Sequence, residues 1–309
     1  MSKFARILAV FLLITAPLFS QSELLTEPAT ATNSFTSGVE GPVCDAAGNL
    51  YACNFQRSGT IGKLTPDGTI SVFATVPAGG RASGLQIDSH GYLIATDYIN
   101  HAIYRVDLQT GEFLESLTKD WAGPQFHQPN DLGIAADDTI YFTDPDWHSP
   151  TGGRVFMITP GQHRKTVMVD EGLNTPNGVT VSPDQRRLYV SQSNAHNVLV
   201  YERNPDGTLR NRKVFFDLTA VENGAAALPD GIRCDKAGNL FVAAVKLGRV
   251  FIVHPDGKLD SRIIKTAGKS PTNIALCGTP KRTLYVTEVD NRRIEKAEIG
   301  SASSPAKPF

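Results

Sequence analysis

Six polar residues recur at similar intervals along the chain, and their side chains are the ones best suited to chemistry. They are Glu40, Ser83, Asn130, Asn177, Asp230 and Thr272, separated by 43, 47, 47, 53 and 42 residues by subtraction. Four of them carry a carboxylate or carboxamide oxygen, and three of these four follow a proline, which restricts the backbone on both sides. Any one of them taken alone indicates only a turn, because Asn, Asp and Ser beside glycine are common turn residues.

A convergence of the four oxygen-bearing side chains would make a metal site. The carboxylates of Glu40 and Asp230 and the carboxamides of Asn130 and Asn177 are costly to remove from water together unless a cation neutralises them. Hard oxygen ligands without Cys or His favour Ca²⁺, Mg²⁺ or Mn²⁺ over a thiophilic metal. We therefore predict that these four residues hold one divalent ion, with Ca²⁺ as the first candidate and Mg²⁺, Mn²⁺ or Zn²⁺ as alternatives.

The elements that must position these residues come from an internal repeat. The string VCDAAGNLYA at 43–52 returns as RCDKAGNLFV at 233–242, and looser versions of it bring the number of copies to six. In each copy two short runs of β-branched and aromatic residues flank a Gly or Asp turn, and most copies add a third and a fourth run after it. Four antiparallel strands in a unit of this length are typical of a propeller blade.

The repeat predicts an all-β fold, a six-bladed β-propeller with four antiparallel strands per blade. The sixth copy has a third run near 292–298 but no fourth, so we expect an N-terminal strand from residues 24–35 to close the ring. Because the first strand of each blade is innermost, the six polar residues should form a ring at the mouth of the central channel. The alternative architecture, a β-sandwich or jelly roll with repeated hairpins, gives no reason for a period kept over six copies.

The N-terminus has the pattern of a signal peptide over residues 1–22. Lys3 and Arg6 precede an apolar run at 7–19, and small residues follow it. A retained membrane anchor is the alternative, but the run is short and contains Pro17. We expect residues 23–309 to form a single propeller domain that is secreted or periplasmic, monomeric, and not attached to a membrane after signal removal.

The charge balance argues against a nucleic-acid partner. The chain has 30 Lys and Arg against 31 Asp and Glu, a formal net charge of -1, and no block of like charges.

The four cysteines do not have metal-site spacing and are expected to lie in buried strands. Cys44 and Cys53 flank one turn and could approach each other across a hairpin. A disulfide between them is therefore an open alternative in an oxidising compartment.

Several strings around the six polar residues resemble one family of propellers. They are VEGP at 39–42, QPNDL at 128–132, YFTDP at 141–145, TPNGV at 175–179 with SPD at 182–184, and LPDG at 228–231. The chain resembles, over nearly all of its length after the signal, the senescence marker protein, gluconolactonase and luciferin-regenerating enzyme family, which includes regucalcin. The resemblance implies a six-bladed propeller in which Glu40, Asn177 and Asp230 bind a divalent metal and Asn130 contacts the metal or the substrate.

The same resemblance implies hydrolysis of sugar lactones, and this chain departs from the family at two positions. Cys44 stands where members often have Trp, and Gln128 stands where many lactonases have Arg. Arg81, two residues before Ser83, is the candidate replacement for that arginine.

The predicted function is hydrolysis of a small lactone or ester, with Asp230 as general base and Asn130 as a ligand or carbonyl-orienting donor. Loops over the ring should contact the substrate through Arg81, His127, Gln128 and Trp147. Two alternatives use the same face of the propeller. One is a non-catalytic propeller that binds a ligand or a protein, and the other is a phosphotriesterase-like hydrolase, because the related squid-type diisopropylfluorophosphatase has a similar calcium site.

Overall fold

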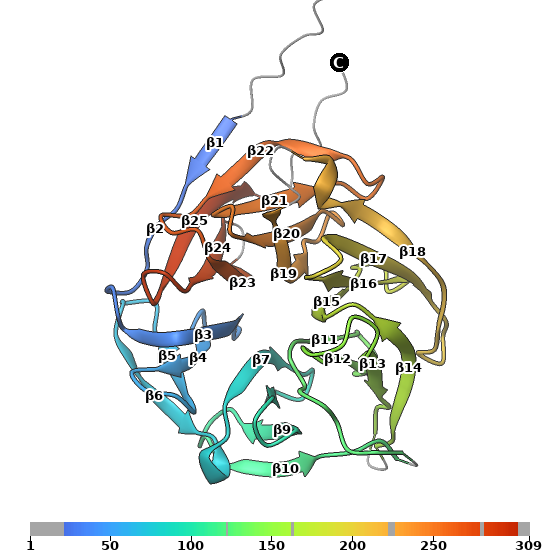
Figure 1. The fold of residues 1–309 in the computed structure, drawn as a ribbon. Coiled ribbons are helices and arrows are strands. Elements are labelled where there is room, and N and C mark those ends of the chain that lie inside the picture. Colours follow the sequence, from blue (N-terminus) through green and yellow to red (C-terminus); the bar gives the residue numbers. More distant parts are fainter. Residues whose placement is uncertain (1–21, 122, 162–163, 222–225, 279–280, 302–309) are drawn as a thin grey trace, which may run out of the picture.

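Six small antiparallel sheets follow one another around a central axis in the computed structural model (Figure 1). The structure describes residues 22–121, 123–161, 164–221, 226–278 and 281–301. The first strand of every sheet lies nearest the axis and the later strands lie progressively further out. This arrangement confirms the six-bladed β-propeller.

The strands of each blade pair in chain order. Blade 1 contains β3 (Phe35–Cys44), β4 (Leu50–Phe55), β5 (Thr60–Leu64) and β6 (Ile70–Thr75). Blade 2 contains β7 (Ala82–Ile87), β8 (Tyr92–Asp97), β9 (Ala102–Asp107) and β10 (Phe113–Leu117). Blade 3 contains β11 (Leu132–Ile134), β12 (Ile140–Asp144), β13 (Gly153–Ile158) and β14 (Thr166–Leu173). Blade 4 contains β15 (Pro176–Val181), β16 (Arg187–Gln192), β17 (Asn197–Arg203) and β18 (Leu209–Asp217).

The last two blades also use the N-terminal segment. Blade 5 contains β19 (Leu228–Cys234), β20 (Leu240–Val245), β21 (Arg249–Val253) and β22 (Leu259–Lys265), and blade 6 contains β23 (Pro271–Cys277), β24 (Lys281–Glu288) and β25 (Arg293–Ser301). The two-residue strand β2 (Glu27–Pro28) pairs antiparallel with β25, which confirms that the segment at 24–35 closes the ring. In addition, β1 (Ser22–Leu25) pairs parallel with β22, so blade 5 has a fifth strand (Figure 1).

The repeated string at 43–52 and 233–242 forms the turn between the first two strands of its blade. The Asp45 carboxylate accepts hydrogen bonds from the backbone N–H groups of Ala47 and Asn49, both at 2.9 Å, and Asp235 makes the equivalent bonds in blade 5. Gly48 adopts a φ of 83°, a left-handed conformation that glycine reaches without strain. The sequence repeat therefore encodes a turn that aligns two strands.

The hydrophobic core lies between neighbouring blades. One cluster joins Tyr51 and Cys53 of blade 1 to Leu85 and Tyr104 of blade 2, and similar clusters follow around the ring. Every residue of β4 and of β13 is buried, because each middle strand is covered on both faces by adjacent blades. This packing uses the apolar side chains between the blades and leaves polar residues to face the channel.

One disulfide joins the first blade to the last. Cys44 is bonded to Cys277, with 5.9 Å between their Cα atoms, and Cys53 is a free, buried thiol. The Cys44–Cys53 alternative is therefore wrong. Cys53 pairs with Glu40 in the middle of β3, whereas Cys44 is the last residue of that strand and pairs with Leu50, about 13 Å further along. Ring closure instead places the ends of β3 and β23 side by side.

The predicted signal peptide lies outside the described residues, apart from Ser22. Within the described ranges, no helix combines the length and the apolar character needed to cross a bilayer.

Candidate functional site

Five of the six recurring polar residues line one cavity of about 250 Å³ at the axis. The cavity is lined by Gly38, Glu40, Ala82, Ser83, Tyr98, Asn130, Trp147, Asn177 and Asp230. Residues from five blades thus meet at one end of the channel, and Glu40 and Asp230 share that end. The sixth residue, Thr272, is not in the lining but donates a hydrogen bond to the carbonyl oxygen of Val39, beside Glu40.

The middle of β3 presents Glu40 to the cavity through an unusual backbone. Gly41 has a φ of 55°, and a Cβ atom there would lie 2.2 Å from the carbonyl oxygen of Ser83. Only glycine fits this close approach of blades 1 and 2. Glu40 Oε2 then accepts hydrogen bonds from Gly41 N at 2.7 Å and from Asn273 Nδ2 at 2.9 Å, which hold the carboxylate in place.

The two carboxamides are also restrained by hydroxyl groups. Ser83 Oγ donates to Asn130 Oδ1 at 3.0 Å, and Asn177 Nδ2 donates to Ser193 Oγ at 3.1 Å. The bond to Ser193 uses the amide nitrogen of Asn177, so its oxygen is the atom left to accept a ligand.

A second ring of hydroxyl groups positions the backbone of the ligand residues. Thr143 donates to the carbonyl oxygen of Asn177 at 2.6 Å, and Ser191 donates to that of Asp230 at 2.7 Å. Thr96 makes the equivalent bond to Asn130. Each of these hydroxyls lies on the second strand of one blade and bonds to the first strand of the next blade or, for Asn130, to the segment that enters that strand. The buried thiol of Cys53 occupies the same position in blade 1 and donates to Ser83 at 3.5 Å. These side-chain to backbone hydrogen bonds therefore join neighbouring blades next to the cavity.

The two carboxylates line the cavity, and burial strongly affects their pKa values. Burial raises the pKa of Glu40 to about 7, and the negative charge of Asp131 contributes. Burial also raises the pKa of Asp230 well above its ordinary value, with further contributions from Glu40 and Asp131. Both shifts show that negative charge at this position is unfavourable when no cation balances it.

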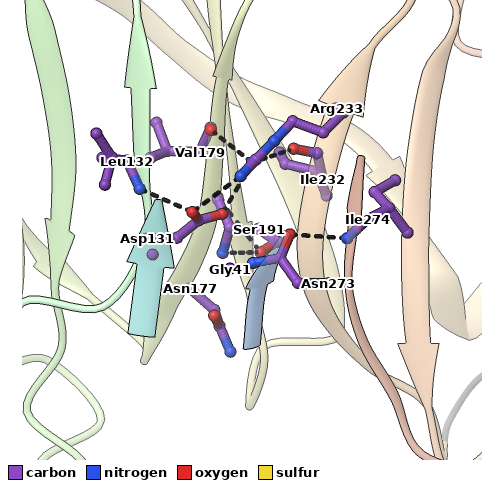
Figure 2. A network of polar contacts seen from close by, with 12 residues as sticks. Gly41, Asp131, Leu132, Asn177, Val179, Ser191, Ile232, Arg233, Asn273 and Ile274 are labelled. Atoms are coloured by element: carbon purple, nitrogen blue, oxygen red, sulfur yellow. Dashed lines mark hydrogen bonds and ion pairs between the residues drawn. The ribbon is translucent and has the colours of Figure 1, made fainter. Parts of the chain in front are cut away.

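Beside the cavity, Asp131 and Arg233 form an ion pair that the sequence reasoning did not predict. Arg233 reaches from β19 to the carboxylate of Asp131, with contacts of 3.0 and 3.1 Å between the paired nitrogen and oxygen atoms (Figure 2). Asp131 is completely buried, and an unpaired carboxylate there would be costly to keep charged. The bidentate ion pair with Arg233 neutralises that charge.

A signal for this pair does exist in the sequence. The position after each recurring polar residue is glycine in four blades, but it is Asp131 in blade 3 and Asn273 in blade 6. A Cβ atom at Gly178 or Gly231 would lie within 2.4 Å of the next blade, which explains the glycines. Asp131 and Asn273 stand at a repeat position where the other four blades have glycine. A polar side chain at such a position indicates a specific bonding partner.

The four predicted substrate contacts lie in different places. Trp147 lines the cavity and is 42% exposed. Arg81 is not in the lining. Its Nη1 donates a hydrogen bond to the hydroxyl of Tyr98, and Tyr98 does line the cavity. His127 and Gln128 are also not in the lining, and their backbone N–H groups bind the Asp144 carboxylate at 3.0 and 2.7 Å. Their roles stay predictions.

Among the described residues, no cluster of three or more His, Cys, Asp or Glu side chains is arranged to hold a metal. The cavity has only two carboxylates, and its other candidate ligands are amides. A site in this cavity would therefore need amide oxygens as well as carboxylates.

Comparisons with known proteins identify a family and relatives over most of the chain. The family model described as "SMP-30/Gluconolactonase/LRE-like region" matches residues 40–290. A gluconolactonase of Zymomonas mobilis is 31% identical over 282 residues, which cover 82% of this chain and 76% of the relative. A 6-deoxy-6-sulfogluconolactonase of Pseudomonas putida is 28% identical, over 77% of this chain and 79% of the relative.

Solved structures show the same fold. A gluconolactonase from Xanthomonas campestris superposes with a TM-score of 0.72 at 25% identity, over 88% of each chain. A calcium-binding regucalcin from Agrobacterium tumefaciens superposes with a TM-score of 0.74 at 18% identity, over 93% of this chain and 99% of the other. The matched region contains the whole ring of polar residues, and the chain belongs to the SMP-30/gluconolactonase/LRE-like family.

Proposed function

We propose that this protein is a lactonohydrolase that opens a small sugar lactone in the cavity, with one divalent cation held by Glu40, Asn130, Asn177 and Asp230. The observation that carries the proposal is the meeting of two carboxylates and two carboxamides from four blades in one cavity. The similarity to the gluconolactonases supports the reaction class.

The charges around the cavity fit a divalent cation. Among the described residues, neither Glu40 nor Asp230 forms an ion pair, whereas Asp131 is neutralised by Arg233. Three carboxylates and one guanidinium leave two negative charges without a partner. Oxygen ligands of this kind suit Ca²⁺ first, with Mg²⁺, Mn²⁺ and Zn²⁺ as alternatives. When bound, such a cation supplies Lewis-acid polarisation of a carbonyl group and lowers the pKa of water.

The residues of the chain would divide the work of hydrolysis. Asp230 accepts a proton from water as the water oxygen bonds to the lactone carbonyl carbon. The ring C–O bond then breaks, and the departing alkoxide takes up that proton, so lactone and water give one hydroxy acid. Asn130 orients the carbonyl group, while Glu40 and Asn177 act as ligands held by Asn273 and Ser193.

The cavity wall suits a sugar-derived ring. Trp147 offers a flat apolar surface for the C–H face of the lactone, next to the polar ring. We propose that Arg81, His127 and Gln128 contribute at the entrance loops, and Arg81 does so through Tyr98.

Removal of divalent cations is expected to abolish catalysis. After exhaustive treatment with a strong chelator, the rate of glucono-δ-lactone hydrolysis should fall to the spontaneous rate, because the site would lose the Lewis acid that polarises the carbonyl group and lowers the pKa of water. Separate additions of Ca²⁺, Mg²⁺, Mn²⁺ and Zn²⁺, followed by pH-stat titration, would identify the ion that restores turnover. An unchanged rate after complete chelation would mean that the metal is not catalytic.

We also propose export from the cytoplasm. The signal-like segment at 1–22 motivates this, and the Cys44–Cys277 disulfide supports it, because stable disulfides form mainly in oxidising compartments. Detection of the mature chain in the cytoplasmic fraction, with both cysteines reduced, would argue against it.

A further inference from the structure

The cavity wall contains a tyrosine that belongs to neither the ring of ligands nor the residues predicted from sequence. Tyr98 follows directly after β8 and lines the cavity together with Glu40 and Asn130. Its hydroxyl oxygen accepts a hydrogen bond of 2.9 Å from Arg81 Nη1. The Arg81 guanidinium also lies over the Tyr98 ring, 5.7 Å from its centroid. Arg81 therefore restrains both the ring and the hydroxyl group.

The direction of this hydrogen bond leaves the tyrosine proton available. A guanidinium has donors only, so the Tyr98 hydroxyl cannot donate to Arg81. Among the described residues, Tyr98 Oη accepts a hydrogen bond from Arg81 and donates none. A donor on the wall of a cavity full of oxygen ligands is suited to a substrate oxygen.

A buried carboxylate holds both residues in position. Asp97, which is completely buried, accepts hydrogen bonds from the backbone N–H groups of Arg81 at 2.9 Å, Ile99 at 2.8 Å and Asn100 at 3.0 Å. Gly80 provides the space, because a Cβ atom there would lie 2.0 Å from Asp97 Oδ2. The segment entering β7 and the turn after β8 are thus tied together on either side of the Arg81–Tyr98 contact.

We propose that Tyr98 is a specificity-determining residue that donates a hydrogen bond to a hydroxyl group of the lactone, and that Arg81 is the positioning residue that orients it. The substrate class is then a polyhydroxylated lactone rather than an unsubstituted one. This inference rests on the proposed lactonohydrolase function and names the two residues that would select a hydroxylated sugar lactone over an unsubstituted one.

Comparing two lactones of the same ring size distinguishes a substrate-binding role of Tyr98 from a purely structural role. Glucono-δ-lactone carries hydroxyl groups around a six-membered ester ring, and δ-valerolactone has the same ring without them. In the wild type, kcat/KM should favour glucono-δ-lactone. Tyr98→Phe should lower kcat/KM for glucono-δ-lactone by roughly 10- to 100-fold and change that for δ-valerolactone by less than about 2-fold, since one substrate hydrogen bond is lost.

Arg81→Met tests the positioning role. It should lower kcat/KM for glucono-δ-lactone in the same selective way, and the double variant should be no worse than Tyr98→Phe alone, because both changes remove one interaction. Tyr104→Phe is the matched control. Tyr104 lies near the same Asp97 carboxylate but does not line the cavity, so its loss should leave the ratio of the two substrates unchanged.

Each outcome has a distinct meaning. Equal losses for both lactones in Tyr98→Phe, or fully additive losses in the double variant, would overturn the proposed roles of Tyr98 and Arg81 while leaving the lactonohydrolase function intact. A wild-type protein that hydrolyses neither lactone above the spontaneous rate would overturn both proposals.

Discussion

Replacement of Asp230 by Asn is expected to reduce kcat/KM for glucono-δ-lactone by a factor on the order of 10³. The substitution keeps the shape of the side chain but removes the negative charge and the proton acceptor. The backbone of residue 230 should stay in place, because Ser191 binds its carbonyl oxygen and Pro229 precedes it. Steady-state kinetics together with circular dichroism would show lost turnover in a folded propeller.

A matched substitution in the same blade separates this effect from a general loss of charge. Asp256 lies in an exposed turn between β21 and β22 and is not part of the cavity lining. Asp256→Asn should retain wild-type kinetics. Full activity in Asp230→Asn would defeat the assignment of Asp230 as general base.

Removal of the Cys44–Cys277 disulfide is expected to have the largest effect on stability. The two cysteines are separated by 233 residues, and a cross-link over so long a span strongly restricts the unfolded chain. The Cys44→Ser, Cys277→Ser double variant should lose about 2–5 kcal/mol of unfolding free energy. Urea unfolding followed by fluorescence would measure the shift in midpoint.

The free cysteine at the end of β19 provides the control for this experiment. Cys234 is the last residue of its innermost strand, as Cys44 and Cys277 are of theirs, but it makes no disulfide. Cys234→Ser should therefore change stability much less. The double variant should keep wild-type kinetics while folded, because neither Cys44 nor Cys277 lines the cavity. A double variant as stable as the wild type would show that β2 and the blade contacts alone secure the ring.

The fold follows from the sequence because its signals are local and repeated. The hairpin string with Asp45 and Gly48 encodes the same turn wherever it occurs, and six copies specify the number of blades. The repeat also predicts that Glu40 and Asp230 lie in one cavity. Residues at equivalent positions of the repeat, on the innermost strands of a closed propeller, must form a ring around the axis.

The remaining features depend on distances that only the closed ring determines. The partner of Cys44 is 233 residues away, and the local spacing to Cys53 gives no indication of it. Arg233 and Asp131 meet between blades 5 and 3, which are not sequence neighbours. Tyr98 belongs to a turn whose orientation is set by the buried Asp97, so its place on the cavity wall could not be inferred from residue spacing.

A crystal structure of the protein grown with Ca²⁺ would test the central claim most directly. We expect density for one ion in contact with carboxylate oxygens of Glu40 and Asp230 and with the amide oxygen of Asn177, and with Asn130 facing the same position. A fully active preparation whose only bound cation lies outside this cavity would contradict the account.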